Sequence, residues 1–176
     1  MENQILNIYS ISTPLEELLC GVVDNKLVLA QFSDSFKLES LLHHLISLRA
    51  LKTLREESPL HKVVQSQINE YFQGERKIFD LPLDPVGTDF QKNIWKLLGN
   101  IGYGHQTTYM KLSRKKGDKK AIRAVASAIG ANPINVIIPC HRVLGSDGKL
   151  TGYAGKTWRK KYLLELENGI KQQSLF

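Results

Sequence analysis

The stretch AIRAVASAIGANPINVIIPCHRV, residues 121–143, contains most of the signals that decide the fold of the second half of the chain. Its first ten residues are small or aliphatic apart from Arg123 and Ser127, a composition with good helix propensity and close packing. Asn132-Pro133 then ends this helix. The β-branched run 136–138 predicts a short strand, which leads directly into Pro139 and Cys140.

A second short helix is predicted just upstream. Thr108 can cap a helix that runs from Tyr109 to about residue 116, and Gly117 stops it. Asp118 is expected to cap the following helix, which begins at residue 119 and ends near Gly130. Two short helices joined by a glycine turn, the second with basic residues, outline a helix-turn-helix. Many unrelated helix pairs also have short turns.

Other signals bound this half of the chain. The prolines in 81–85 exclude regular helix, so the domain boundary is placed after residue 83. Thr88 and Gln91 form the two ends of a capping box that starts a helix. A last helix is predicted over 157–167.

The first half alternates like β structure. Segments 5–9, 18–23 and 27–32 are short and apolar, and Asp24-Asn25-Lys26 supplies turn chemistry for a hairpin between the last two. Two amphipathic helices are expected to follow. The second spans 60–71, and the first carries its apolar side chains largely on one face: Leu38, Leu41, Leu42, Leu45, Leu48 and Leu54.

Charge is distributed unevenly along the 176 residues, whose net charge is +7. Residues 1–83 hold 8 basic and 11 acidic side chains, whereas residues 84–176 hold 16 and 6. A basic half favours a polyanionic partner such as nucleic acid, although a solvated basic face is the alternative. The sequence has no apolar run of membrane-spanning length and no signal-peptide pattern, so a cytoplasmic location is expected.

Cys140 is one of two cysteines, and Cys20 is expected to be a small core residue. The sequence has no cluster with zinc-ligand spacing, and we expect no metal. His141 and Arg142 would favour the thiolate form of Cys140, which is the nucleophilic form. The alternative is a buried cysteine beside a structural histidine, and a Cys-His pair by itself leaves both open.

Three segments give this cysteine a family context: GNIGYGHQTTYMKLS at 99–113, the PCHRV core at 139–143 and GYAG at 152–155. With them the chain resembles the O6-alkylguanine-DNA alkyltransferases, also called methylated-DNA–protein-cysteine methyltransferases. The resemblance covers residues 84–169. It extends more loosely to the first half through STPLEELL and INEYFQGERKIFDLPLD.

The resemblance implies a two-domain α+β fold. Residues 1–83 would be a ribonuclease H-like α/β domain, and residues 84–169 a winged-helix or helix-turn-helix-like domain that carries the chemistry. Residues 170–176 would be a tail. The implied protein is a monomer without a cofactor, and its partner is double-stranded DNA containing O6-alkylguanine. Whether O4-methylthymine is also a substrate is left open.

The resemblance also assigns catalytic roles. Cys140 would take the alkyl group from O6 of guanine in a single turnover, and His141 would help deprotonate it through a water, held by Glu167. Asn132 would brace the turn before the reactive loop, and Tyr109 would donate a hydrogen bond to guanine N3. Without the family, Glu167 would be an exposed helix-end charge, Asn132 a structural residue and Tyr109 a core aromatic.

DNA contacts are implied for the helix that follows Gly117. Arg123 would enter the base stack when the target nucleotide rotates out. Ala124 and its small neighbours would let the helix approach the minor groove. Phosphate contacts are expected from a basic run that includes Lys120: Arg114, Lys115, Lys116, Lys119 and Lys120.

The substrate pocket is implied to lie next to the reactive loop. Tyr153 would pack against the flipped base, with Ala154 and Gly155 completing the wall. The backbone carbonyls of Cys140 and Val143 would accept hydrogen bonds from the exocyclic amine of guanine.

The sequence departs from the family pattern at four positions. Glu16 and Lys156 stand where glycine is common, and Gly102 stands where proline is common. Gly130 replaces a residue that is basic in some members. Lys156 would alter the mouth of the pocket, and Gly130 would remove one phosphate contact.

Three other classes compete with a repair enzyme. A lesion sensor would bind alkylated DNA without chemistry, but its relatives lack the cysteine. A helix-turn-helix regulator would leave the PCHRV core unexplained. A Cys-His hydrolase would turn over an ester or peptide and would not need a basic DNA-facing helix.

Overall fold

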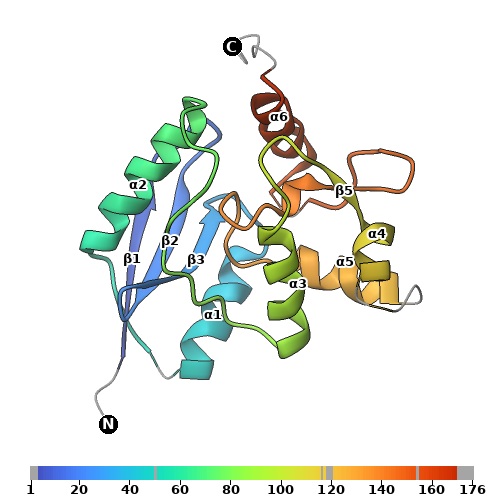
Figure 1. The fold of residues 1–176 in the computed structure, drawn as a ribbon. Helices are drawn as coiled ribbons and strands as arrows, with labels where there is room; N and C mark the ends of the chain where they lie inside the picture. The colour runs from blue at the N-terminus through green and yellow to red at the C-terminus, as the bar shows by residue number, and fades with distance from the viewer. Residues whose placement is uncertain (1–3, 50, 116, 118–120, 154, 170–176) are drawn as a thin grey trace. The chain divides into compact units, whose positions relative to one another are not determined.

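The computed structural model describes residues 4–49, 51–115, 117, 121–153 and 155–169 of the chain (Figure 1). The chain divides into two compact units, residues 1–86 and 87–176. Helices and strands occur together in both units, which confirms the α+β class. Asp118, Lys119, Lys120, Ala154 and the expected tail lie outside the described residues. Within the described ranges, no helix has the length and apolar character needed to cross a membrane.

A four-stranded sheet forms the centre of the first unit, with strand order β3-β2-β1-β4. β1 and β2 are antiparallel, as are β2 and β3, while β4 pairs in parallel with β1. The predicted hairpin is confirmed: Asp24 and Asn25 have φ values of 48° and 55°, as a two-residue primed turn requires. The strands span Ile5–Ile11 (β1), Leu18–Val23 (β2), Lys26–Phe32 (β3) and Lys52–Leu54 (β4).

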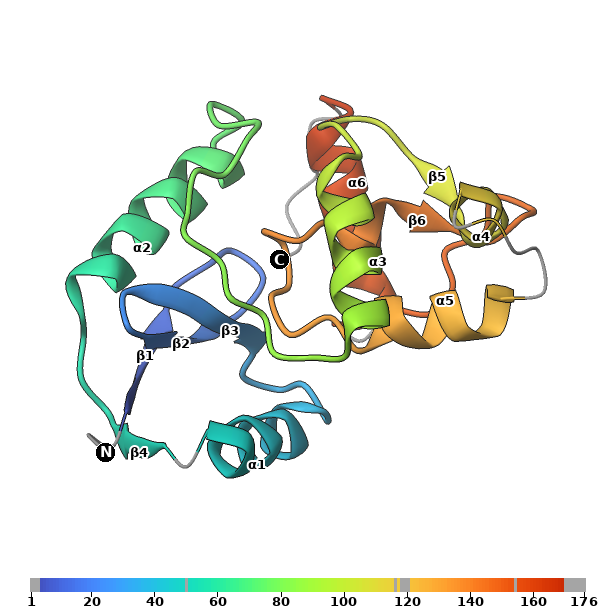
Figure 2. The same cartoon turned by 60° about the horizontal axis from the view of Figure 1, so that its bottom comes forward.

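Two helices cover opposite faces of this sheet (Figures 1 and 2). α1, Leu38–Arg49, packs on the face that presents Leu6, and α2, Pro59–Phe72, lies on the face that presents Tyr9. The placement of Leu54 on the first helix was wrong. Its segment pairs with β1 because α1 ends at Arg49 and the chain returns beside the sheet.

The segment 82–84 belongs to this first unit. Leu27 donates its backbone N–H to the Pro82 carbonyl at 2.8 Å, and Asp84 donates to the Leu27 carbonyl at 2.9 Å. Arg49 also pairs with the Asp84 carboxylate at 2.7 Å. The proline-rich segment therefore extends the edge of the sheet at β3.

The second unit is mostly helical (Figure 2). The predicted capping box is confirmed, because Gln91 N donates to Thr88 Oγ1 at 3.2 Å and Thr88 N donates to Gln91 Oε1 at 2.9 Å. Thr108 caps its helix through Lys111 N at 3.2 Å. The helices are Asp89–Gly99 (α3), Tyr109–Lys115 (α4), Ile122–Gly130 (α5) and Thr157–Glu167 (α6), and a parallel pair of short strands joins Thr107–Thr108 (β5) to Val143–Leu144 (β6).

The segment between α5 and the reactive cysteine is a turn, so the predicted strand over 136–138 was wrong. Val136 has a φ of 69°, which is rare for a β-branched residue. Asn132 imposes this course: its Oδ1 accepts from Ile134 N at 3.0 Å, and its Nδ2 donates to the Ile138 carbonyl at 2.9 Å. The side-chain amide of Asn132 thus provides the hydrogen bonds for this segment, and the segment does not pair as a strand.

Glu16 and Lys156, at which the resemblance led us to expect glycine, both have left-handed backbones, with φ values of 120° and 73°. A side chain in these regions costs about 1–3 kcal/mol. The backbone is therefore strained at both Glu16 and Lys156.

We predict that Glu16→Gly raises the free energy of unfolding by about 1 kcal/mol. Relief of strain exceeds the extra unfolded-state entropy of glycine, which is roughly 0.5–1 kcal/mol. Urea denaturation followed by circular dichroism measures the change. Glu17→Gly is the matched control and should be destabilising, because Glu17 is not among the residues with positive φ. Equal effects of the two substitutions would contradict the prediction.

Candidate active site

Cys140 begins a 3-10 turn, Cys140–Arg142 (η2), which follows Pro139. Only 5% of the residue is exposed. Two buried amides flank its sulfur: Asn132 Nδ2 lies 3.1 Å from Sγ, and the thiol can donate to Asn135 Oδ1 at 3.8 Å. The Asn132 N–H stabilises the thiolate, whereas the Asn135 oxygen accepts from the thiol, so the two amides act in opposite directions on the same atom.

Glu167 lies at the end of α6 and is 6% exposed, not at the surface as a helix-end charge would be. His141 Nε2 lies 2.8 Å from Glu167 Oε1. Arg142 donates through Nε to Oε2 and through Nη2 to Oε1, both at 2.9 Å. Gly104 N adds a fourth contact at 3.3 Å. Burial raises the pKa of this carboxyl, but the hydrogen bonds and charges of His141 and Arg142 outweigh it and hold the pKa at about 2.

His141 is fully buried, and burial lowers its pKa despite the opposing effect of Glu167. The ring is therefore neutral at pH 7. Because a carboxylate can only accept, Nε2 carries the proton and Nδ1 keeps its lone pair. Within the part of the chain that the structure describes, Nδ1 is buried and has no hydrogen-bond partner. It is the ring atom that can take a proton.

From its position next to Cys140 in the sequence, Arg142 was expected to favour the thiolate. In the structure, its guanidinium instead forms hydrogen bonds with the Glu167 carboxylate. Its guanidinium also donates to the Ile101 carbonyl and lies 6.0 Å from the centre of the Tyr103 ring. These contacts tie the loop after α3 to the reactive turn. Cys140 therefore contacts the amides of Asn132 and Asn135, whereas the next two residues, His141 and Arg142, bind the Glu167 carboxylate.

Tyr109 starts α4, and its hydroxyl donates to the carbonyls of Thr151 and Gly152 at 3.3 and 3.5 Å. Gly152 permits this approach, because a Cβ there would lie 3.0 Å from the Tyr109 oxygen. Burial, and then the charge of Cys140, raise the pKa of Tyr109. Tyr109 is therefore a neutral donor at pH 7, close enough to Cys140 for the two to interact electrically.

The expected pocket wall is buried. Tyr153 is 9% exposed, and its hydroxyl has no hydrogen-bond partner among the described residues. Gly155 is buried and its carbonyl accepts from Arg159 Nη1 at 3.3 Å. Val143 is fully buried and begins β6, directly after the reactive turn. Ala154, the fourth residue of this wall, lies outside the described residues.

Sequence reasoning missed Lys160, which is fully buried on α6. Its ammonium donates to the Val143 carbonyl at 2.5 Å and to the Thr151 carbonyl at 2.9 Å. The surrounding run Arg159-Lys160-Lys161 looks like a solvated basic face. No local signal distinguishes the buried lysine from its neighbour Lys161, whose side chain is 66% exposed.

Arg123 and Ala124 are both exposed on α5. Both lie in the first turn of the helix, whereas Val125, Ala128 and Ile129 form its buried face. The structure therefore leaves the expected DNA-contacting side chains accessible. Lys120, expected to contact phosphate, lies outside the described residues.

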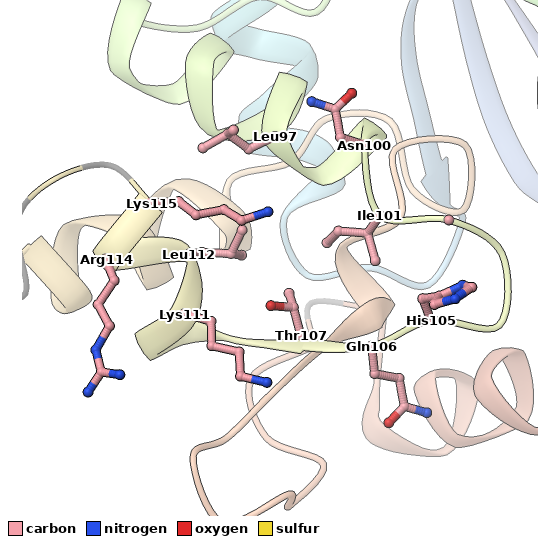
Figure 3. A pocket seen from close by; sticks show the side chains of 11 residues that line it. Leu97, Asn100, Ile101, His105, Gln106, Thr107, Lys111, Leu112, Arg114 and Lys115 are labelled. Atoms are coloured by element: carbon pink, nitrogen blue, oxygen red, sulfur yellow. The ribbon is translucent and has the colours of Figure 1, made fainter.

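A pocket of about 530 Å³ lies away from Cys140, between the end of α3, the loop before β5 and α4 (Figure 3). Its floor includes Leu97, Ile101 and Leu112. Lys115 directs its amine toward these side chains, whereas Arg114 points away from them (Figure 3). The residues that line this basic hollow do not include Cys140, His141 or Glu167, so it is separate from the site around the thiol.

No group of three or more His, Cys, Asp or Glu side chains among the described residues is placed to hold a metal ion. Cys20 and Cys140 are both buried, and they are not joined in a disulfide.

Fold and site together define a two-unit α+β protein in which a buried cysteine stands beside a histidine held by a glutamate. Residues 9–85 match the sequence model described as 6-O-methylguanine DNA methyltransferase, ribonuclease-like domain. Residues 89–169 match the model of the same family's DNA binding domain. The chain belongs to the 6-O-methylguanine DNA methyltransferase family.

Individual relatives agree with this assignment. The chain is 45% identical over 135 residues to a methylated-DNA–protein-cysteine methyltransferase of Methanosarcina barkeri, covering 73% of this chain and 85% of that protein. A crystal structure of the Mycobacterium tuberculosis O6-methylguanine methyltransferase has a TM-score of 0.79 at 36% identity, over 97% of both chains. A complex of the Mycobacterium tuberculosis protein with DNA gives the same TM-score and identity over 93% of this chain and 94% of that one.

We predict that Glu167→Gln destabilises the protein by about 3–5 kcal/mol, because it leaves the buried Arg142 cation without a charged partner. The carboxyl has a depressed folded pKa, so its contribution is present above about pH 4.3 and is lost as the pH falls toward 2. Urea denaturation at pH 7 measures the loss. Glu165→Gln, on the same helix but paired with Lys161 at the surface, should change stability by less than about 1 kcal/mol. Similar losses in both variants would contradict the central role of Glu167.

Proposed function

We propose that this chain repairs alkylated DNA by moving the alkyl group of O6-alkylguanine irreversibly to Cys140, once per molecule. The observation that carries the proposal is the buried Cys140 sulfur between two amides, beside a neutral His141 held by Glu167. Family membership supplies the reaction class, and the relatives named above are methyltransferases of this kind.

The residues support a direct displacement. The Cys140 proton passes to His141 Nδ1 through an intervening water, and the Asn132 amide stabilises the resulting thiolate. Sγ then attacks the alkyl carbon, so that the S–C bond forms while the C–O6 bond breaks and leaves its electron pair on guanine. Tyr109 donates its proton toward guanine N3, which neutralises the leaving base. His141 returns the proton that Tyr109 loses, and a stable thioether remains.

Access to the thiol requires the base to leave the duplex. The thiol of a residue that is only 5% exposed cannot reach an atom inside a base stack. We propose that the nucleotide rotates into the site, that Arg123 replaces it in the stack, and that Ala124 allows α5 to approach the minor groove. The wall from Tyr153 to Gly155 would receive the base, with the carbonyls of Cys140 and Val143 accepting from its amine.

Phosphate contacts are assigned to the basic side chains of α4. Lys111, Arg114 and Lys115 are exposed, and all three line the basic hollow of Figure 3. Such contacts provide affinity that falls with salt and depends little on sequence, as a protein that scans any DNA requires. A reducing compartment such as the cytoplasm suits a protein whose Cys20 and Cys140 are thiols that are not joined in a disulfide.

The test of the proposal is the mass of the intact protein after mixing with a duplex that contains one O6-methylguanine. We expect one added methyl group per molecule, saturating at that value, and none in Cys140→Ala. Cys20→Ala is the matched control and should still accept one methyl group, because Cys20 is a fully buried core residue. A wild-type protein that binds the duplex without gaining mass would be a lesion sensor, and repeated release of product would indicate a hydrolase.

A second prediction concerns Arg123. Arg123→Ala should lower the single-turnover rate on duplex DNA by about 10- to 100-fold, because an unstacking cost of a few kcal/mol is no longer offset. The rate with free O6-methylguanine base should not change, since no stack has to be opened. Arg114→Ala removes the same charge from α4 and serves as the control for electrostatic attraction. A parallel loss with duplex and free base would show that Arg123 does not act in base flipping.

A further inference from the structure

Lys160 is a buried cation that the proposed chemistry does not use. Its side chain is fully buried, and burial lowers its pKa to about 8, so that it remains largely protonated at pH 7. An ammonium removed from water is costly unless hydrogen bonds replace the solvent. In Lys160 two backbone carbonyls provide that replacement.

The two acceptors belong to different parts of the site. Val143 begins β6, immediately after the turn that carries Cys140, and Thr151 precedes the wall that contains Tyr153. The ammonium of Lys160 therefore links the strand that follows the Cys140 turn to the segment that precedes Tyr153. Tyr109 joins the same arrangement: its hydroxyl donates to the Thr151 carbonyl, and Lys160 Nζ lies 5.9 Å from the centre of its ring.

Lys161 shows that this arrangement is not a general property of α6. It follows Lys160 directly, yet it is exposed and pairs with Glu165 at 3.7 Å. A leucine in place of Lys160 would fill the interior without the cost of burying a charge. The ammonium instead holds the Val143 and Thr151 carbonyls in place.

We infer that Lys160 is a positioning residue for base recognition: by fixing the Val143 carbonyl, it makes the site select purines that carry an exocyclic 2-amine. The inference rests on the proposed function, in which that carbonyl accepts from the amine of the flipped guanine. A carbonyl oxygen has two lone pairs, so the bond from Lys160 leaves one available for the base.

The physical reason is orientation. A peptide carbonyl at the start of a two-residue strand has little regular structure to hold it, and β6 pairs only through Val143 and Leu144. Small misplacements of a polar group reduce the rate strongly. A site built to bind a substrate N–H also rejects an analogue that lacks it, because its acceptor is then left without a partner.

The experiment compares single-turnover rates on two duplexes, one with O6-methylguanine and one with O6-methylhypoxanthine, which lacks the 2-amine. Both substrates use the same thiol, so their rate ratio cancels changes in the ionisation of Cys140. The variants are Lys160→Met, the conservative Lys160→Arg and the matched control Lys161→Met. Lys160→Gln replaces Lys160→Met if the latter does not fold.

We expect the wild type and Lys161→Met to prefer O6-methylguanine at least tenfold. Lys160→Met should lower the guanine rate about tenfold or more and leave the hypoxanthine rate nearly unchanged, and Lys160→Arg should restore part of the preference. Equal losses on both substrates would reduce Lys160 to a structural role and overturn the inference. A wild type without a preference would also overturn it. A wild type that transfers no methyl group would instead refute the proposed function itself.

Discussion

The carboxylate of Glu167 is the group on which the second unit depends. It is buried, it stays ionised because its pKa is held near 2, and it accepts from His141, Arg142 and the backbone of Gly104. These donors come from the reactive turn and from the loop after α3, while the carboxylate comes from the last helix. A single charge therefore joins three segments that are far apart in sequence, and the tautomer of His141 is fixed by the same contact that fixes the fold.

This arrangement separates the two sides of the reactive turn. The side formed by His141 and Arg142 is held by charge, and the side formed by Cys140 is held by the neutral amides of Asn132 and Asn135. Neutral donors allow a thiol at rest and a thiolate at the moment of attack.

The parts of the fold that sequence predicted are those decided within a few residues. The Thr88–Gln91 capping box and the Asp24-Asn25 turn follow from local hydrogen bonds and from residues that tolerate positive φ. The strand expected over 136–138 was wrong because side-chain hydrogen bonds of the nearby, buried Asn132 determine that backbone, and the β-branched pattern does not reveal them. The PCHRV core and family resemblance predicted the nucleophile and its histidine. The burial of Glu167 and Lys160 could not be read from their exposed-looking neighbours, because it results from packing between segments that are remote in sequence.

Trp95 of α3 donates its indole N–H to the Ala128 carbonyl at 2.8 Å, near the end of α5. The other tryptophan, Trp158, lies beneath the Arg159 guanidinium on α6. Both tryptophans of the chain thus belong to the second unit, and the first unit has none. The intrinsic tryptophan fluorescence of the unlabelled protein therefore reports only on the second unit, which contains Cys140. One fluorophore, Trp95, lies on α3, and the other, Trp158, lies on α6, the helix that ends with Glu167.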